Sequence, residues 1–231
     1  MTVNCSLSTL EAYDRWAASY PPEAHNPLMR IEQRAMLAHW PDVTDCCALD
    51  LACGTGRYSS LLMRSGAREV IAADFSTAML RQVSAGTPVR ANMVQLPFAA
   101  SAFDVVVCGL ALGHAPDLHR WVGEVARVLD DGGVLLYSDF HPEAARAGLT
   151  RSFKDEHNRS VVLPHCDYDV SEQREAIEAA NLTLEVVQEL RAGMDCQESF
   201  PGSDTFYRQW HGLPLVLIVR ARKCAPCQRK A

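Results

Sequence analysis

The sequence predicts an α/β fold in which a mostly parallel sheet carries helices on both faces. Three observations predict it. Short apolar segments alternate with helical patterns at intervals of about 10 to 15 residues, which is typical of β-α-β units and a parallel sheet. The first apolar segment ends in a glycine-containing turn, Cys53-Gly54-Thr55-Gly56. The last two apolar segments, 183–190 and 214–221, have no helical pattern between them, so they should pair antiparallel.

Length and composition indicate one globular domain. The chain has 231 residues, a formal net charge of −6, 48% apolar residues and 22% charged residues. These values are average for a folded domain and exclude a disordered, collagen-like or coiled-coil chain. At about 150 residues per domain the length allows one domain or two, and no linker or internal repeat divides the sequence. The acidic balance disfavours a nucleic-acid partner, although basic residues cluster near the C-terminus (Arg220, Arg222, Lys223, Arg229 and Lys230).

The nine cysteines do not have the pattern of a disulfide scaffold, because their number is odd and their spacing is scattered. The segment 1–16 lacks the basic and apolar regions of a secretory signal. The longest apolar runs, 105–112 and 213–219, are far shorter than the ~20 residues of a membrane span. We therefore expect a cytoplasmic protein with reduced thiols. Cys224 and Cys227 have a zinc-like spacing, but no second pair accompanies them, so we expect no metal.

The first half of the chain predicts a helical cap followed by alternating strands and helices. The segment 1–45 is polar, with aromatic residues at intervals, and it predicts helices that cover the rest of the fold. From residue 46, apolar runs of strand length alternate with helical patterns, and the run Val105-Val106-Val107 indicates a strand buried on both faces. The predicted strands are 48–51, 69–74, 89–93, 103–108 and 134–140, and the predicted helices are 58–65, 77–85 and 118–129.

The second half completes the sheet. The alternation lapses over 141–170 and returns with a predicted helix at 171–180 and the strands 183–190 and 214–221. Between these strands the sequence predicts a loop without a helix, which carries Phe200, Phe206, Tyr207 and Trp210. The prediction is a single domain with seven strands. Its parts are an N-terminal helical cap (1–45), a core (46–140), an insertion (141–170), the last helix and strand pair (171–223) and a tail (224–231).

The turn after the first strand indicates a ligand site. Its glycines allow a sharp turn and close approach of a ligand, and it leads into a helix N-terminus. Dinucleotide sites use such a turn too, but counted from Gly54 their third glycine would stand at Ser59, and counted from Ala52 the third position is Arg57. Asp50, at the strand tip, would repel a pyrophosphate. A carboxylate there suits the ammonium group of S-adenosylmethionine, which has no phosphate.

Two further strand ends carry side chains that suit an adenosine group. Asp74 ends the second strand 18 residues beyond Gly56, close to the ~20 expected for an acid that binds a ribose diol. Asn92 ends the third strand, where its amide can meet the amino edge of an adenine with Met79 and Met93 beside the ring. The fourth strand ends at 108–110 beside the first, next to the crevice where ligands bind in doubly wound sheets.

Together these motifs resemble those of the class I S-adenosylmethionine-dependent methyltransferases. The most similar branch includes the ubiquinone/menaquinone-biosynthesis and biotin-pathway malonyl-carrier-protein methyltransferases. The resemblance spans 13–223 and rests on five motifs in order, at 49–56, 74–79, 96–106, 114–117 and 129–133. It departs at Ala52, which replaces the usual first glycine, and at Asn92, where many members carry Asp. It implies a Rossmann-like, doubly wound, seven-stranded sheet with an antiparallel last strand and an insertion that caps the substrate.

The resemblance implies S-adenosyl-L-methionine as the cofactor and S-adenosyl-L-homocysteine as its product. By position it assigns Asp50, Ala52, Gly54 and Gly56 to the methionine moiety and Asp74 to the ribose. It assigns Phe75, Asn92, Met93 and Val94 to the adenine, with Met79 beside them. It places Cys108 and Leu110 under the sulfonium end, with Tyr20 closing the pocket.

The implied reaction is an in-line displacement at the sulfonium methyl group, for which a protein mainly aligns the reactants and excludes water. A general base is needed only where the acceptor keeps its proton at neutral pH. Four histidines are candidates for that base. His114 and His141 follow the fourth and fifth strands, and His157 and His165 lie in the insertion. Each has a purely structural role as its alternative.

The expected acceptor is a small molecule, and the expected enzyme is a monomer or homodimer without a nucleic-acid or membrane partner. Three alternatives stay open. The first is an NAD(P)-dependent oxidoreductase, the second a non-catalytic S-adenosylmethionine-binding protein, and the third a methyltransferase acting on tRNA or protein. The sequence does not distinguish O-, N-, S- and C-methylation, because the insertion, the N-terminal helices and the last loop would shape the acceptor site.

Overall fold

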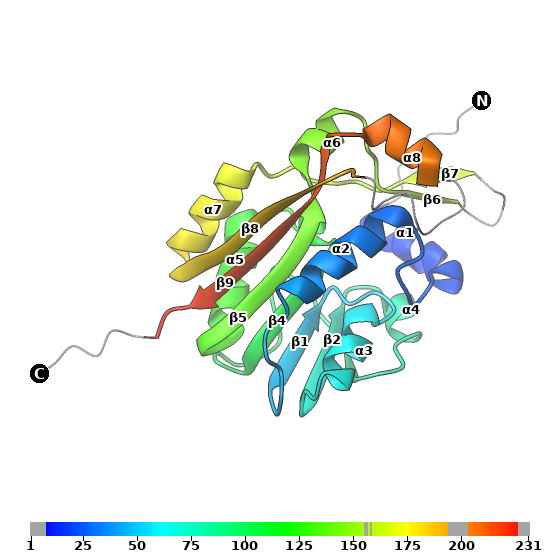
Figure 1. The fold of residues 1–231 in the computed structure, drawn as a ribbon. Helices are drawn as coiled ribbons and strands as arrows, with labels where there is room; N and C mark the ends of the chain where they lie inside the picture. Colours follow the sequence, from blue (N-terminus) through cyan, green and yellow to red (C-terminus); the bar gives the residue numbers. More distant parts are fainter. Residues whose placement is uncertain (1–7, 155–156, 158, 194–202, 226–231) are drawn as a thin grey trace, which may run out of the picture.

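The fold is built on a seven-stranded sheet with the strand order β3-β2-β1-β4-β5-β9-β8 (Figure 1). The computed structural model describes residues 8–154, 157, 159–193 and 203–225. The strands of this sheet are β1 (Cys47–Leu51), β2 (Glu69–Asp74), β3 (Thr87–Arg90), β4 (Phe103–Gly109), β5 (Leu129–Phe140), β8 (Leu182–Arg191) and β9 (Pro214–Lys223). The predicted seven-stranded sheet is therefore confirmed.

The strand directions also agree with the prediction. The first five strands run parallel, and β9 pairs antiparallel with both β5 and β8. β1 lies between β2 and β4, so the strand order reverses at this point of the sheet. In doubly wound folds the crevice outside the carboxyl ends of the strands at such a reversal is where ligands bind.

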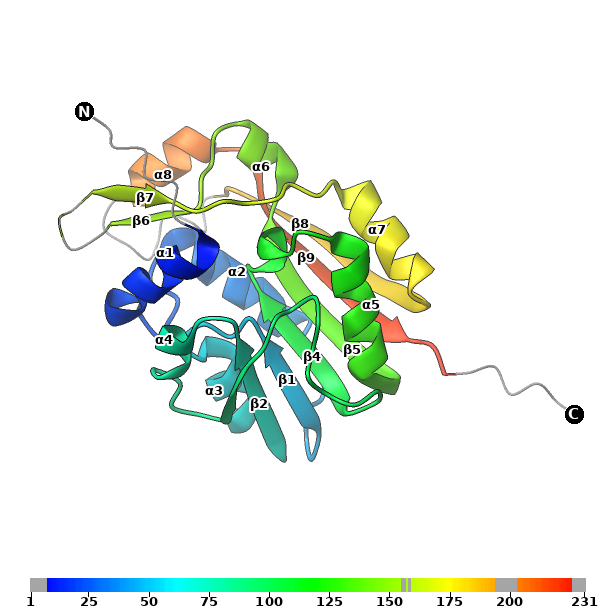
Figure 2. The same ribbon diagram turned by 180° about the vertical axis from the view of Figure 1, so that it is seen from behind.

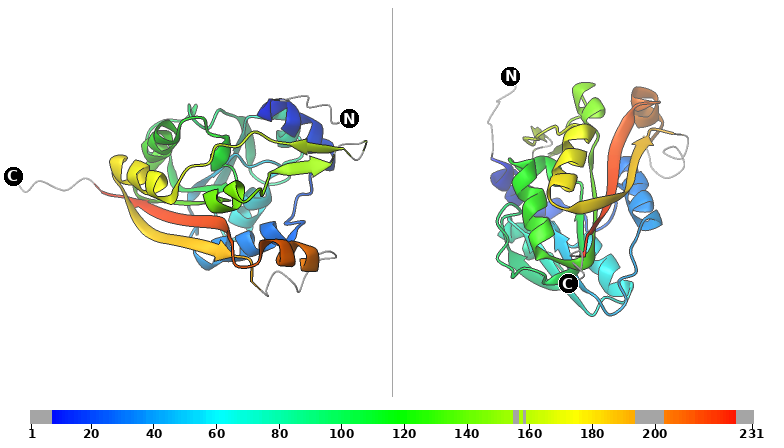
Figure 3. Two further views of the ribbon diagram at one scale, coloured as in Figure 1. Left: turned by 90° about the horizontal axis from the view of Figure 1, so that it is seen from above. Right: turned by 90° about the vertical axis from the view of Figure 1, so that its left-hand side faces the viewer.

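Helices cover both faces of the sheet, as Figures 2 and 3 show. α5 (Leu118–Val128) and α7 (Val170–Ala179) lie on one face, and α2 (Pro27–Ala38) and α3 (Arg57–Arg64) lie on the other. Successive residues of β4 point into different cores, because side chains alternate across a strand. Val106 packs in the core that includes α5, and Val105 packs in the core that includes α2. Both faces of this strand are apolar for that reason.

Side-chain caps start several of these helices. Ser8 and Glu11 form a capping box at the start of α1 (Thr9–Trp16). Asn26 accepts a hydrogen bond from a backbone N–H of α2, and Asp117 does the same for α5. Each cap provides a partner for an N–H group that the helix itself leaves unpaired.

A smaller assembly covers the carboxyl ends of the strands. It consists of α1, the 3-10 helix η1 (Ala17–Ser19) and a hairpin of β6 (Ser152–Lys154) and β7 (Ser160–Val162). Figure 1 shows the hairpin above α1. The rings of Trp16 and Phe153 stack with their centroids 4.6 Å apart and their planes 7° from parallel. Ala12, Phe153 and Leu163 form a separate small core. The hairpin and the N-terminal helices therefore cover the crevice together.

The structure corrects the predicted loop between the last two strands. A helix, α8 (Ser203–Trp210), occupies part of it. Phe206 and Trp210 stand four residues apart and both pack against the core that contains Leu215, so their spacing is that of one helical face. Phe200 lies outside the described residues. The last two strands are antiparallel all the same, because α8 does not return the chain to the opposite end of the sheet.

Three predicted boundaries also shift. The third strand, predicted over 89–93, is β3 (Thr87–Arg90), so Asn92 lies beyond its end, in an isolated bridge with Gln95. α4 (Thr77–Leu80) is a single turn, because the chain then bends so that Val83 packs onto the small core of Cys53, Ala72 and Leu80. β5 begins at Leu129 and absorbs the predicted turn at 130–133. Only the shift of β3 moves a strand end beside the crevice, and Asn92 and Met93 line the cavity from the segment after that end.

No helix in the described part of the chain is long and apolar enough to cross a bilayer. Within the same residues no group of three or more His, Cys, Asp or Glu side chains is arranged to hold a metal ion. Cys224 is exposed and lies 3.0 Å from the hydroxyl of Thr183, whereas Cys227 lies outside the described residues.

Candidate active site

A cavity of about 560 Å³ lies over the carboxyl ends of β1, β2 and β4, with α1 and η1 on its other side. Its volume is in the range of sites for cofactors and small molecules. Most of the residues predicted from the sequence line it, namely Tyr20, Asp50, Ala52, Gly54, Asp74, Phe75, Asn92, Met93, Val94, Leu110 and His114. The structure therefore brings together residues from five different segments of the chain.

Three predicted cofactor residues do not line the cavity. Gly56 has φ +87° and stands at the start of α3, where an added Cβ would lie 3.3 Å from Cγ1 of Val83. Met79 and Cys108 are buried behind the cavity wall. These three residues shape the turn and the wall behind the cavity.

The turn after β1 is held by hydrogen bonds to two carboxylates. Asp50 is buried and accepts from both the backbone N–H and the hydroxyl of Ser59, each at 2.6 Å. The N–H of Gly54 donates to Oδ2 of Asp74 at 2.8 Å. Ala52 and Gly54 both adopt left-handed backbone, with φ of +55° and +56°. The two strand ends and the start of α3 are thereby fixed relative to one another.

Burial shifts the titration of both carboxylates. It raises the pKa of Asp50 to about 6, although the hydrogen bonds from Ser59 and the charge of Arg57 act in the opposite direction. Burial also raises the pKa of Asp74, against the backbone hydrogen bonds that it accepts. Both groups face a space from which water is partly excluded, so a cationic or hydroxyl-bearing ligand would replace lost solvation.

Apolar side chains line much of the cavity at the end near β2 and β3. Phe75 follows β2 and is 48% exposed, with the Arg90 guanidinium 5.3 Å from its ring centre. Met93 and Val94 line the wall beyond β3. The amide oxygen of Asn92 accepts from the N–H of Val94 at 3.1 Å, and its second lone pair stays available. This end suits the face and edge of a planar base.

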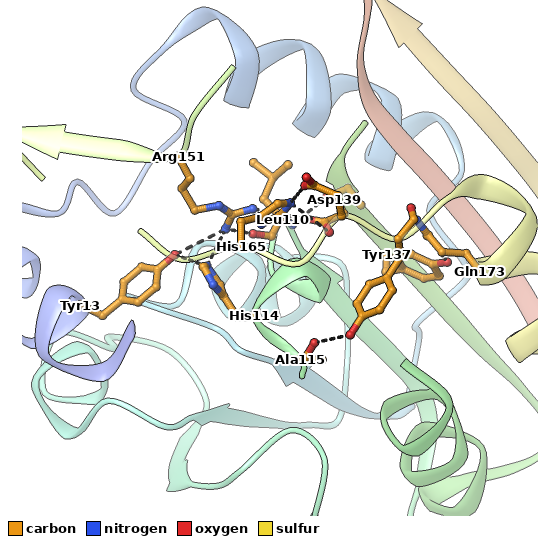
Figure 4. Close-up of polar contacts among 12 residues, drawn as sticks. Tyr13, Leu110, His114, Ala115, Tyr137, Asp139, Arg151, His165 and Gln173 are labelled. Carbon is orange, nitrogen blue, oxygen red and sulfur yellow. Dashed lines mark hydrogen bonds and ion pairs between the residues drawn. The ribbon is translucent and has the colours of Figure 1, made fainter. Parts of the chain in front are cut away.

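A buried arginine occupies the opposite end, beside the tip of β4. Arg151 comes from the insertion, and its Nη1 donates to the carbonyl oxygen of Leu110 (Figure 4). Its Nη2 lies 3.2 Å from Oδ1 of Asp139, and its guanidinium carbon lies 4.5 Å from the ring centre of Phe140. Burial raises the pKa of Asp139 to about 6, although the charge of Arg151 opposes this. A cation therefore forms part of the cavity wall.

His114 and Tyr13 extend this group toward the cover. Nε2 of His114 lies 2.8 Å from the Tyr13 hydroxyl and 3.0 Å from Nη1 of Arg151. Both neighbours can donate to it, which favours the neutral ring with the proton on Nδ1. Burial, together with the charge of Arg151, holds the pKa of His114 well below its ordinary value. Figure 4 shows Tyr13, His114 and Arg151 converging on one point.

The other three candidate histidines do not reach the cavity. His141 is 2% exposed. Its backbone N–H donates to the carbonyl oxygen of Leu215, and its Nδ1 accepts from the backbone N–H of Glu143 at the start of α6 (Pro142–Arg146). His165 packs beside His114, and its Nε2 lies 4.0 Å from Oδ2 of Asp139. Burial and the charge of Arg151 lower the pKa of His165 to about 4. His157 is exposed in a turn of the insertion. Among the four, only His114 is placed to meet a ligand there.

Comparison with known proteins identifies the family. Residues 49–137 match the family described as a methyltransferase domain. The malonyl-[acyl-carrier protein] O-methyltransferase of Enterobacter lignolyticus is 31% identical over 189 residues, which are 78% of this chain and 74% of that protein. The chain belongs to the class I S-adenosylmethionine-dependent methyltransferases. This agrees with the resemblance that the sequence motifs indicate.

Other proteins match this methyltransferase over different shares of its length. A demethylmenaquinone methyltransferase of Thermobifida fusca is 40% identical over 101 residues, which are 40% of this chain and 42% of that protein. The chain therefore spans less than half of that relative. The crystal structure of an S-adenosylmethionine-dependent methyltransferase from Mesorhizobium loti has a TM-score of 0.69 at 24% identity, and the match covers 83% of this chain and 97% of that one. It supports the fold alone.

The cavity of this methyltransferase fits S-adenosylmethionine, the cofactor of its family. Two carboxylates, the buried Asp50 and the half-buried Asp74, suit a ligand that is positively charged and carries a diol. The space above Gly54 is open, since an added Cβ would meet nothing within 4 Å. The apolar walls at Met93 and Val94 suit the adenine. These carboxylates do not support an NAD(P)-dependent oxidoreductase, one of the alternatives that the sequence left open, because Asp50 would repel the pyrophosphate of that cofactor.

Several polar residues of the methyltransferase site could not be identified from the sequence pattern. Arg151 lies in an irregular insertion without periodicity, and nothing local marks it. Asp139 gives a usable signal, because it is a charged residue in the apolar run of a central strand. Arg57 directly follows the glycine turn, and its partner Glu32 is a fully buried carboxylate on the otherwise amphipathic α2. Only contacts across the fold reveal that these residues meet.

Proposed function

We propose that this methyltransferase acts on a small molecule and methylates an oxygen that is already ionised at neutral pH, of which a carboxylate is the simplest. The position of Arg151 is the observation that supports this most. Its cation lines the cavity beside Leu110, at the end remote from the residues suited to adenine. A buried cation favours an anionic oxygen there through charge-assisted hydrogen bonds. The name of the malonyl relative, an O-methyltransferase, agrees with this chemistry.

The chain's own residues would orient the two reactants. Asp50 binds the ammonium group of the cofactor, Asp74 its ribose hydroxyls, and Phe75, Asn92 and Met93 its base. The cofactor supplies an activated methyl group on a sulfonium. Alignment and exclusion of water by the cover account for most of the rate enhancement expected of such a site. Tyr20, which lines the cavity under the cover, closes the pocket over the methionine end.

A histidine base is the second candidate, and His114 is the residue that could provide it. Its neutral ring at pH 7 favours that role. Its Nε2, however, has a single lone pair and lies within hydrogen-bond distance of two donors, Tyr13 and Arg151, so a donor would have to leave before it takes a proton. For an acceptor that is already ionised no base is required. His114 then serves to hold Tyr13 and Arg151 in position.

An acceptor panel separates these two proposals. It pairs small carboxylic acids with their methyl amides and adds phenols and alcohols, and release of S-adenosylhomocysteine is measured. We expect turnover with acids only. Arg151→Gln should lower kcat/KM by about 10- to 100-fold, the value of a lost charge-assisted hydrogen bond. Arg146→Gln, which changes an exposed arginine of the same insertion, serves as the control. Turnover of alcohols that is abolished by His114→Gln would instead support the histidine base.

A further inference from the structure

One corner of the cavity carries positive charge that neither the acceptor site nor the ribose site uses. Arg57, Tyr20 and His25 all line it. The rings of Tyr20 and His25 lie 5.8 Å apart, edge to face. Nδ1 of His25 is buried and has no hydrogen-bond partner in the described part of the chain. Burial lowers the pKa of His25, and the nearby charge of Arg57 lowers it further. The guanidinium of Arg57 is therefore the charged group of this corner, and Tyr20 and His25 add neutral polar groups beside it.

The Arg57 guanidinium lies over the Tyr58 ring, with its central carbon 4.3 Å from the ring centre, and only one of its two terminal nitrogens donates to a side chain of the described residues. Its Nη1 donates to Glu32 at 2.9 Å and to Gln33 at 3.0 Å. Its Nη2 donates to none of the described residues and lies 3.5 Å from where a Cβ on Gly109 would be, at the tip of β4. Because Gly109 lines the cavity, this free arm stands beside the ligand space. The side chain is 11% exposed, so the donor is largely shielded from water.

Glu32 fixes the position of this cation. It is fully buried on α2 and also accepts from the hydroxyls of Tyr58 at 2.7 Å and Ser138 at 2.6 Å. Three donors from α3 and β5 therefore hold one carboxylate. Such a pair is costly to bury unless its hydrogen bonds are satisfied, and here those of Glu32 are. Arg57 is thus presented to the cavity in one orientation.

We propose that Arg57 binds the carboxylate of the amino-acid end of S-adenosylmethionine, while Asp50 binds its ammonium group. This inference rests on the cofactor orientation proposed above. Asp50 is the last residue but one of β1 and Arg57 begins α3, and the hydrogen bonds from Ser59 to Asp50 bring these two segments together. One corner then presents a carboxylate and a guanidinium, which matches a zwitterion. Glu32 acts as a positioning residue and does not touch the ligand.

The test removes the carboxylate from the ligand and the guanidinium from the protein. Binding of S-adenosylhomocysteine and of its decarboxylated analogue, the 3-aminopropyl thioether of adenosine, is measured by titration calorimetry. Wild-type protein should bind the carboxylate-bearing ligand at least about tenfold more tightly, as for one charge-assisted hydrogen bond. The double variant Glu32→Gln/Arg57→Met, which leaves no unpaired buried charge, should bind both ligands equally. Arg64→Met, an exposed change at the far end of α3, should keep the preference.

Each outcome bears on the inference. Equal binding of both ligands by the wild type, or an unchanged preference in the double variant, would overturn the role of Arg57. A wild type that binds neither ligand would instead overturn the proposed cofactor site. If circular dichroism shows the double variant to be unfolded, Arg57→Lys decides, because lysine can pair with Glu32 but lacks the second arm. Its preference should fall by several-fold, and full retention would contradict the inference.

Discussion

Two residues of the turn after β1 adopt left-handed backbone, and only one of them is a glycine. Gly54, at φ +56°, pays no steric penalty, whereas Ala52, at φ +55°, carries a Cβ. The left-handed region costs an L-residue about 1–2 kcal/mol. Ala52 also stands where members of the family usually have their first glycine. The cofactor turn is therefore strained at one identifiable position.

Ala52→Gly should raise the free energy of unfolding by about 0.5–1 kcal/mol. It relieves the backbone strain, and the larger entropy of glycine in the unfolded chain offsets part of the gain. Gly54→Ala should lower the same quantity by about 1 kcal/mol, because its added Cβ meets no neighbour and only the strain remains. Urea denaturation of both variants measures the difference. Destabilisation by Ala52→Gly would mean that packing of the Ala52 methyl group against the core outweighs its strain.

The raised pKa of Asp50, about 6, predicts opposite pH effects on stability and on ligand binding. The folded protein favours the protonated acid, so this stabilising contribution is complete below about pH 4, the ordinary pKa of Asp, and is lost as the pH rises to 6. Its size is roughly 3 kcal/mol at most. Binding of an ammonium group requires the charged form. Affinity for S-adenosylhomocysteine should therefore fall below pH 6, by up to about tenfold per pH unit.

Titrations between pH 5 and 8 compare the wild type with Asp50→Asn. The variant should bind more weakly at pH 7, without the loss of affinity below pH 6, and should unfold at a higher temperature at pH 7. Asp139→Asn is the matched control, since burial also raises the pKa of Asp139 to about 6 but its side chain does not line the cavity. A wild-type pH profile that persists in Asp50→Asn would assign the titration to another group.

At the scale of elements, α1 depends on contacts with distant parts of the chain. With eight residues it is too short to be a stable helix on its own. Ala12 packs with Phe153 and Leu163, and three further contacts hold α1 over the cavity. Asp14 accepts from the Ser76 hydroxyl at 2.5 Å, Tyr13 bonds His114, and Trp16 stacks on Phe153. The cover should consequently be among the least stable parts of the fold.

Trp16→Ala should loosen α1 without unfolding the sheet. Removing the ring takes away the stacking contact between α1 and the hairpin, so amide hydrogen exchange over 9–19 should become at least tenfold faster, while that of α5 stays unchanged. Exchange measured by mass spectrometry gives both values in one experiment. Arg15→Ala, an exposed change on the same helix, should have no effect. Equal acceleration in α5 would show that α1 opens only with global unfolding.

Elements with a clear period could be predicted from the sequence, and elements that depend on distant contacts could not. Four of the five parallel strands could be predicted closely, because each contains an apolar run with a turn at its end. The range of β3 could not, because three of its four residues are exposed. The helix α8 was not, because four aromatic residues in a polar segment suit a loop as well as a helix until Phe206 and Trp210 meet the core. The same limit applies to the site. Asp50 and Asp74 follow from strand ends, whereas the contact of Tyr13 with His114 joins residues 101 positions apart.

At the scale of the whole molecule, the cavity draws on segments from both sides of the chain's midpoint. Its walls come from α1, from the ends of β1, β2 and β4, and from the insertion that carries Arg151. The sheet beneath is completed by β8 and β9, and residues of β9 enter both large cores. A ligand in the cavity therefore contacts most parts of one continuous structure. Its binding should stabilise the molecule as a unit.

S-adenosylhomocysteine at about 100 times its Kd should add about 2.7 kcal/mol to the free energy of unfolding, which raises the Tm of a chain of this size by about 5–10 °C. NADH should leave the Tm unchanged, because Asp50 repels its pyrophosphate. Circular dichroism reports the sheet and helices, and the part of the tryptophan fluorescence change that Trp16→Phe removes reports the cover. Both signals should shift equally. A shift confined to one signal would mean that cover and sheet unfold separately, and a shift with NADH alone would contradict the cofactor assignment.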